Sequence, residues 1–128
     1  SITNTSFADV AGVNTITITP TSTSNKLFLR WWAASIGFVA GEGLEIRIVD
    51  TVSGNVHTGD FGMRVHNRAD GSNEEWDGQQ ECKAVIAVPR ASSTTYKIQA
   101  KVNTGTGYVN WGGSQSEFIW DIMEVTTS

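Results

Sequence analysis

The chain has 128 residues, a length typical of one globular domain, and 39% of them are hydrophobic, which is enough for one core. Only 17% are charged and the formal net charge is −4, which argues against a nucleic-acid-binding protein, because such proteins neutralise phosphates with Lys and Arg. No apolar run approaches the ~20 residues of a membrane-spanning helix, and the single cysteine, Cys82, excludes an internal disulfide.

Strict alternation of apolar and polar residues predicts three half-buried strands. In residues 14–19 the isoleucines share one side and the threonines the other, and Pro20 ends the strand because it cannot donate to a ladder. Residues 44–48 repeat this alternation, as do residues 95–102, whose apolar side begins at Tyr96. A period of two therefore governs these parts of the chain.

Other segments are apolar on both sides, which predicts strands buried on both faces or strands with one face in a subunit contact. They are residues 27–34, 82–88 and 118–125. Shorter candidate strands are residues 6–10, 52–60, 62–66 and 107–111. Turn residues separate these segments, and none shows a helical period. We therefore predict an all-β chain, a single antiparallel, jelly-roll-like β-sandwich domain over residues 1–128 with about 8–10 short strands and no significant helix.

One long polar stretch, residues 64–80, surrounds Trp76 with acidic side chains and predicts a loop. We interpret it as a solvated surface excursion. Its residues 70–77, from Asp70 to Asp77, also carry oxygen ligands of the kind that calcium prefers, although their spacing does not match an EF-hand. Whether this loop binds calcium stays open.

Candidate catalytic residues are few. His57 and His66 lack the close ligand spacing of a zinc site. Cys82 lies on a strand whose alternate positions are apolar, which predicts a buried small side chain and not a nucleophile. Glu74, Glu75 and Asp77 share one loop, which is a poor arrangement for the paired carboxylates of a glycosidase. We therefore predict that the chain is not an enzyme and has no catalytic residues, cofactor or metal.

The five tryptophans indicate aromatic contacts beyond a small core. Adjacent strand residues point to opposite faces, so Trp31 and Trp32 cannot both enter the same core. We therefore expect an assembly interface formed by Phe28, Trp31, Trp32 and Trp120. Exposed aromatics can instead contact a glycan or another partner, and the candidates for that contact are Trp76, Tyr108 and Trp111.

Residues 5–13 (TSFADVAGV) and 15–27 (TITITPTSTSNKL) follow the pattern T-S-x-x-D-v-x-G and then v-T-I-T-P-x-S-x-S-x-K-I/L. Residues 92–100 (SSTTYKIQA) follow s-x-T-Y-x-v-q, and residues 118–125 (FIWDIMEV) form a strand that ends in m-E-v. In this order the segments resemble small β-sandwich domains of bacteriophage virion proteins, which include capsid decoration or cement proteins and tail-fibre tips. Together they span nearly the whole chain.

The resemblance implies a jelly-roll-like sandwich, often trimeric, without catalytic residues, in which residues 20–25 connect the second and third strands. We accordingly expect a non-enzymatic virion protein at the particle surface, in first place a capsid decoration protein bound to the outer shell as a homotrimer. Its partners would be the major capsid protein or tail proteins, without nucleic acid or membrane.

The alternative is a tail-fibre or receptor-binding tip that recognises a host glycan. The chain holds one domain without a visible stalk, and this favours a capsid decoration protein over a fibre tip. Trp31–Trp32 and the acidic residues 70–77 depart from the family pattern and leave the partner open.

Overall fold

The computed structural model describes residues 1–39, 42–54, 63–68, 75–109 and 118–126. Within these ranges the chain forms strands and turns without helix, which confirms the predicted fold class, and no helix there could span a membrane. The strands are β1 (Ala8–Asp9), β2 (Ile16–Ile18), β3 (Lys26–Val39), β4 (Glu42–Asp50), β5 (Met63–Arg68), β6 (Glu75–Ala87), β7 (Thr94–Val102), β8 (Thr106–Tyr108) and β9 (Phe118–Val125).

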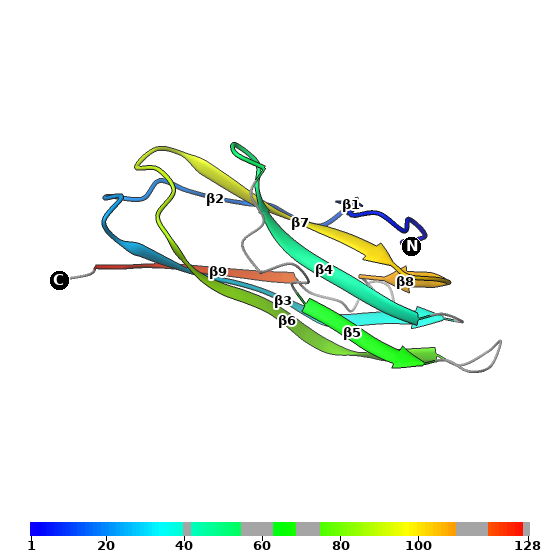
Figure 1. Ribbon diagram of the computed structural model, residues 1–128. Helices are drawn as coiled ribbons and strands as arrows, with labels where there is room; N and C mark the ends of the chain where they lie inside the picture. The colour runs from blue at the N-terminus through cyan, green and yellow to red at the C-terminus, as the bar shows by residue number, and fades with distance from the viewer. Residues whose placement is uncertain (40–41, 55–62, 69–74, 110–117, 127–128) are drawn as a thin grey trace.

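The strands form two antiparallel sheets that lie face to face (Figure 1). In the first, which we call the β7 sheet, β7 pairs with β1 and β2 on one side and with β4 on the other, and β4 pairs with β5. In the second, the β3 sheet, the long strand β3 lies between β6 on one side and β8 and β9 on the other. The molecule is therefore a β-sandwich.

The pairings are nested along the chain, as in a folded ribbon. β4 pairs with β5, β3 with β6, and β2 with β7, and outside them Ile2 forms a bridge with Gly107 of β8. In addition to these nested pairs, β4 pairs with β7 and β3 pairs with β9. The result is the double-sheet arrangement of a jelly roll. A Cβ at Gly107 would lie 2.8 Å from Leu44 Cδ1 and 2.9 Å from Val102 Cγ1, so a larger residue here would force these two buried side chains to shift.

The core fills the space between the two sheets, and the alternation seen in the sequence explains its composition. Along β7 the buried and half-buried residues alternate without a break from Thr94 to Val102. The buried apolar side chains of the neighbouring strands come from β4, β3 and β6: Leu44, Ile46, Ile48, Leu27, Leu29, Trp31, Ala33, Ile36 and Cys82. The predicted burial of Cys82 is confirmed.

An irregularity in β3 keeps its apolar side in the core on both sides of the irregularity, from Leu27 to Ile36. The register with β6 shifts between Ala33 and Ile36, so that two residues separated by an odd number of positions both point inward. Such a shift is the effect of a β-bulge, which adds a residue to one strand and reverses its parity.

Two predicted segments differ from the structure. Residues 64–80 are not one loop, because most of them belong to β5 and β6; pairing of Glu75 with Val39 extends β6 well beyond its apolar part. Residues 52–60 were predicted as a strand, but residues 51–53 form a turn that ends at Gly54, whose N–H donates to the Asp50 carbonyl at 2.8 Å. The rest of that segment lies outside the described residues.

Candidate functional site

The candidate site is the outer face of the β3 sheet, where three neighbouring strands turn large apolar side chains outward. Among the described residues, four of the five exposed large hydrophobic side chains belong to this face: Val85 (65% exposed), Met123 (58%), Val125 (44%) and Ile119 (40%). Half-buried Phe28 and Trp32 of β3 lie between them. We call these six residues the apolar face.

The register of β3 with its two neighbours arranges the apolar face in rows that cross the strands. Phe28 pairs with Val85 of β6 and with Met123 of β9, which gives one row of three apolar side chains. Trp32 pairs with Ile119 of β9 and, on its other side, with Glu81 of β6, and Val125 of β9 is paired with Lys26 of β3. Each row therefore joins segments that are far apart in sequence.

A charged row lies between the two apolar rows. Arg30 of β3 pairs with Lys83 of β6 and Asp121 of β9, and its guanidinium contacts the carboxylates of Glu81 at 2.7 Å and Asp121 at 2.6 Å. Lys83 Nζ lies 3.1 Å from Glu81. Hydrogen bonds to Glu81 and Asp121 raise the pKa of Arg30, and those from Arg30 and Lys83 lower the pKa of Glu81. The four groups carry no net charge, and each of the two cations lies within 3.1 Å of a carboxylate.

A carboxylate at the end of β9 ties this strand to the connection between β2 and β3. Glu124 accepts hydrogen bonds from Thr21 N at 2.9 Å, Thr21 Oγ1 at 2.8 Å, Ser22 N at 3.3 Å and Asn25 Nδ2 at 2.7 Å. The bond from Asn25 outweighs burial and, with the others, lowers the pKa of Glu124. The two ends of the chain that carry the family resemblance are thus in contact, and β9 is held against β3.

The structure divides the predicted assembly residues between the two faces of β3 and β9. Trp31 is fully buried and stacks on Phe118, with ring centroids 5.8 Å apart. Trp120, which pairs with Trp31, packs against the core, and its indole N–H donates to the Asn14 carbonyl at 2.9 Å. Trp31 and Trp120 are therefore corrected to core positions, because paired residues on adjacent strands share a face. Phe28 and Trp32 remain on the outer face.

Val85, Ile119, Met123 and Val125 are not among the residues that were expected at the interface from the sequence. Their alternation with inward residues was visible in residues 82–88 and 118–125. That alternation separates two sides of a strand without saying that the outer sides of β6, β3 and β9 adjoin. Only the register of β3 with both neighbours brings the four residues together with Phe28 and Trp32.

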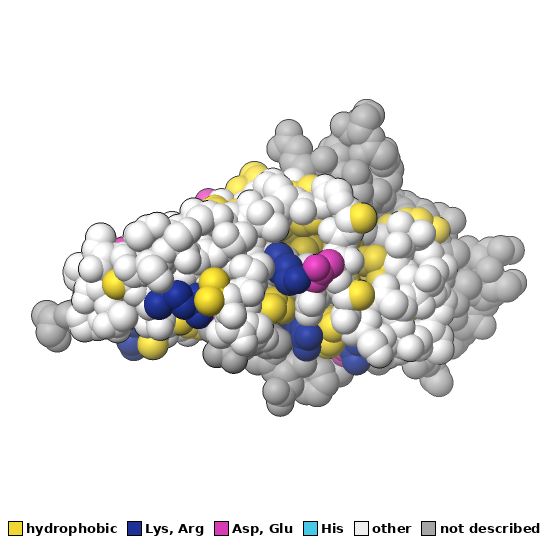
Figure 2. Space-filling view, turned by 90° about the horizontal axis from the view of Figure 1, so that it is seen from above, with side chains coloured by type: hydrophobic (Ala, Val, Ile, Leu, Met, Phe, Trp, Pro, Cys, Tyr) yellow, Lys and Arg dark blue, Asp and Glu magenta, His cyan; other side chains and the backbone are white. Residues whose placement is uncertain are grey.

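The opposite outer face, on the β7 sheet, is polar and internally paired. The Asp9 carboxylate lies 2.7 Å from Lys97 Nζ and accepts from Gln99 Nε2 at 2.9 Å, while Gln99 Oε1 accepts from Arg47 at 2.8 Å. The Arg47 guanidinium also lies 4.1 Å from the centre of the Phe7 ring. Figure 2, which looks onto this sheet, shows mostly uncharged polar side chains and backbone, with basic and acidic side chains next to each other near the centre.

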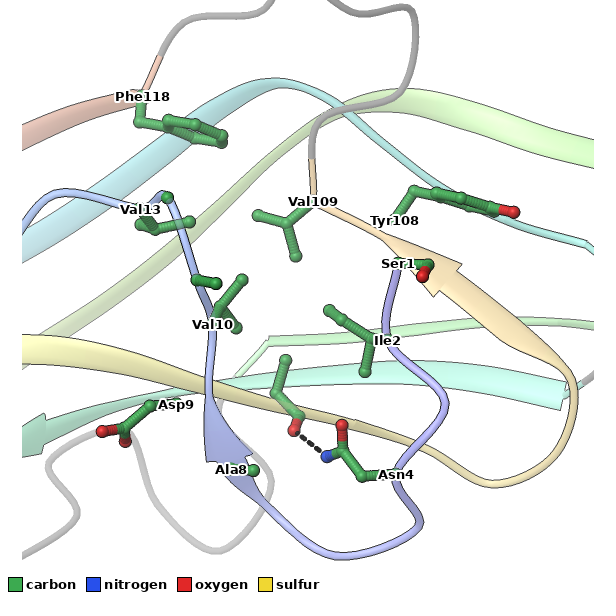
Figure 3. A pocket seen from close by; sticks show the side chains of 13 residues that line it. Ser1, Ile2, Asn4, Ala8, Asp9, Val10, Val13, Tyr108, Val109 and Phe118 are labelled. Atoms are coloured by element: carbon green, nitrogen blue, oxygen red, sulfur yellow. Dashed lines mark hydrogen bonds between the residues drawn. The ribbon is translucent and has the colours of Figure 1, made fainter.

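A pocket of about 290 Å³ opens at one edge of the sandwich, between the N-terminal segment, β1, β8 and the start of β9. Figure 3 shows the side chains of Ile2, Val10, Val109 and Phe118 around it, drawn from these separate segments. Tyr108 also lines the pocket, whereas the Trp76 side chain and Trp111 lie outside the described residues. Of the three predicted glycan-contact residues, the structure therefore places only the side chain of Tyr108, and the contact stays a prediction.

Other predicted sites fall largely on parts that the structure leaves undescribed. His57 and residues 70–74 lie outside the described ranges, and for His66, Glu75 and Asp77 only the strand positions are given. Across the described part of the chain, no group of three His, Cys, Asp or Glu side chains is placed to hold a metal ion.

Comparison with known proteins gives no relative to guide the assignment. Neither the scan against protein-family models nor the search of curated proteins finds a match for this chain. The functional interpretation therefore depends on the fold, on the two outer faces and on the sequence resemblance.

Proposed function

We propose that the chain is a non-enzymatic structural protein of a bacteriophage particle, a capsid decoration protein that acts at the particle surface as a homotrimer. The sequence resemblance supports the phage assignment, and the jelly-roll arrangement of the two sheets is compatible with it. Fold alone hosts many functions, so the assignment depends on the site more than on the architecture.

The observation that carries the assembly role is the apolar face. Four exposed large side chains on β6 and β9 flank the half-buried Phe28 and Trp32 of β3, although the same sheet packs against the core on its inner side. Contiguous apolar patches on soluble proteins mark interaction sites more often than chance. Covering apolar area stabilises a contact by about 25 cal/mol per Å². The proposed partners are copies of this chain, with the major capsid protein or tail proteins forming the particle beneath.

The test is whether the protein occupies particles of the phage that encodes it. Particles lacking the protein are mixed with purified chain and sedimented, and mass spectrometry compares heads and tails separately. We expect the chain to sediment with heads; sedimentation with tails would assign it to the fibre instead. The Trp31→Ser variant, which loses its core, controls for adsorption of unfolded protein. Absence from wild-type particles and no binding to either part would contradict the proposal.

A second candidate function, recognition of a host glycan by a fibre or receptor-binding tip, is favoured by one feature. A shallow depression of about 230 Å³ on the outer face of the β3 sheet is lined by Arg30, Trp32, Gln79 and Glu81. An aromatic ring beside charged and amide groups is the combination that stacks on a sugar ring and bonds its hydroxyls.

A glycan array separates this candidate from the first. Binding that is lost in Trp32→Ala and kept in Tyr108→Ala would place recognition in the depression. Loss in Tyr108→Ala alone would place it at the edge pocket. An array without any bound glycan contradicts the second candidate and leaves the particle test to judge the first.

A further inference from the structure

The charged row on the apolar face has a direction across the strands. Lys83, at the β6 side, is 60% exposed, and Asp121, at the β9 side, is 54% exposed. Between them, Arg30 is shared by Glu81 and Asp121. Lys83 keeps most of its surface in solvent despite its contact with Glu81. The β6 side of the face therefore presents Lys83, with the less exposed Glu81 beside it, and the β9 side presents the anion Asp121.

The symmetry of a homo-oligomer decides whether the β6 side of one copy contacts the β6 side or the β9 side of the next copy. Rotation about an axis parallel to the strands keeps every row at its own level and brings the β6 side of one copy to the β9 side of the next. Lys83 would then face Asp121, and Val85 would face Met123. Rotation about an axis perpendicular to the strands and lying in the plane of the contact would place Lys83 on Lys83 and Asp121 on Asp121. Charge complementarity favours the parallel axis.

The proposed function supplies the number of copies, and the face is compatible with a ring. Three strands about 4.8 Å apart and eight residues of about 3.3 Å each cover on the order of 400 Å² in projection. In a three-fold ring each copy contacts two neighbours, one at the β6 side of this face and one at the β9 side, so that the flanks of β6 and β9 are covered as well as the centre.

We propose that three copies of this chain pack the outer faces of their β3 sheets around an axis parallel to the strands. In this arrangement Lys83 of each copy meets Asp121 of the next copy, and Val85 meets Met123 one row away. This inference rests on the proposed assembly function and specifies its geometry. It makes the trimer a property of the isolated chain, independent of any shell protein.

Paired cysteines test the geometry directly. In a Cys82→Ser background, Val85→Cys and Met123→Cys are introduced together. Both positions pair with Phe28, so they lie two strand spacings, about 9.6 Å, apart within one copy. That separation exceeds the ~7 Å limit between the Cα atoms of a disulfide, so any bond must join different copies. Oxidation should give a covalent trimer on a non-reducing gel, and each single cysteine variant should give none.

Charge exchange tests the pairing in a second way. Lys83→Asp should weaken association by roughly tenfold per contact, because an ion pair becomes a repulsion. Lys83→Asp combined with Asp121→Lys should restore association, since the exchange returns opposite charges to the contact. Circular dichroism of each variant separates loss of contact from loss of fold. Association is measured by sedimentation velocity at micromolar concentration.

Several results would overturn the inference. A wild-type monomer, covalent dimers in place of trimers, or a trimer unaffected by Lys83→Asp would each do so, as would failure of the exchanged pair to restore association. None of these results touches the phage assignment, which is decided by the presence of the protein in particles. A chain that forms the trimer and is absent from particles would instead overturn the proposed function and keep the geometry.

Discussion

The two outer faces of the sandwich arise from the same alternation and carry opposite chemistry. On the β7 sheet the outward positions hold Thr, Lys, Gln and Arg, and neighbouring strands supply their partners: Thr17 and Thr95 hydroxyls lie 2.6 Å apart, and Asp9 binds Lys97 and Gln99. On the β3 sheet the outward positions hold Phe, Trp, Val, Ile and Met around a row of ion-paired side chains whose charges cancel. One face has its partners within the chain, and the other exposes apolar side chains that no neighbour in the described ranges covers.

This contrast teaches that hydrophobicity alone does not mark the core of this protein. An exposed polar pair contributes little to stability, with a median of ~0–1 kcal/mol, but keeps a surface soluble. An exposed apolar face lowers solubility and stabilises the fold less than the core does, so its presence points to a contact. The predictions below test whether the inner and outer sides of these strands, and the two outer faces, differ as described.

The largest expected effect separates Trp31 from Trp32. Trp31→Ala removes a fully buried ring and should lower the free energy of unfolding by ~3–5 kcal/mol. Trp32→Ala removes a half-buried outer ring and should lower it by less than ~1.5 kcal/mol while weakening self-association. Urea denaturation and sedimentation measure the two quantities. Equal destabilisation by both variants would mean that the assignment of inner and outer sides of β3 is incorrect.

Thiol labelling compares the two sides of β6. Native Cys82 is buried and should react only when the structure opens, roughly 10³-fold more slowly than an exposed thiol. Val85→Cys in a Cys82→Ser background places the thiol on the outer side of the same strand and should react at the rate of a free thiol in the monomer. Rapid labelling of native Cys82 without unfolding would contradict the inward orientation of that residue.

An ion pair near the end of β4 makes a pH-dependent contribution to the free energy of unfolding. Burial raises the pKa of Asp50, but hydrogen bonds from Arg90, Val52 and Ser53 outweigh it and lower the pKa from 3.8 to about 2. The carboxylate therefore stabilises the fold above pH ~4, by on the order of 2 kcal/mol, and this stability disappears as the pH falls through about 2.

Asp50→Asn should remove that contribution. The free energy of unfolding of the variant should fall below that of the wild type by on the order of 2 kcal/mol at neutral pH, and the two should converge towards pH 2. Denaturation at a series of pH values measures the difference, so that the other carboxylates cancel. A difference that stays constant from neutral pH to pH 2 would assign the role to packing and not to charge.

The smallest effect is expected on the polar outer face. Asp9→Ala and Lys97→Ala, alone and together, should show a coupling below ~1 kcal/mol and leave self-association unchanged. Val85→Asp, on the apolar face, is the matched comparison and should abolish association of a folded chain. Loss of association in the Asp9 or Lys97 variants would place the contact on the β7 sheet and not on the β3 sheet.

The sequence by itself determined the elements whose signal is local. Alternation in residues 14–19, 44–48 and 95–102 predicted β2, β4 and β7, and the chain is all-β as expected. The apolar alternate positions around Cys82 predicted its burial. The rule that neighbours on a strand point to opposite faces also predicted that Trp31 and Trp32 separate. These results follow from a period of two, which every strand carries within itself.

Tertiary structure alone decided which strands adjoin, and it decided the inner side of the strands that carry large apolar residues on both sides. Trp31 and Trp120 face inward because the β7 sheet covers that side, and within residues 27–34 only Arg30 distinguishes the outer side from the inner one. The polar residues at the start of β6 form a strand because they bond to β3, without apolar periodicity of their own. The apolar face likewise needs β6, β3 and β9 in register. A period of two shows which residues of one strand share a side. The packing of a second sheet decides which of the two sides faces the core.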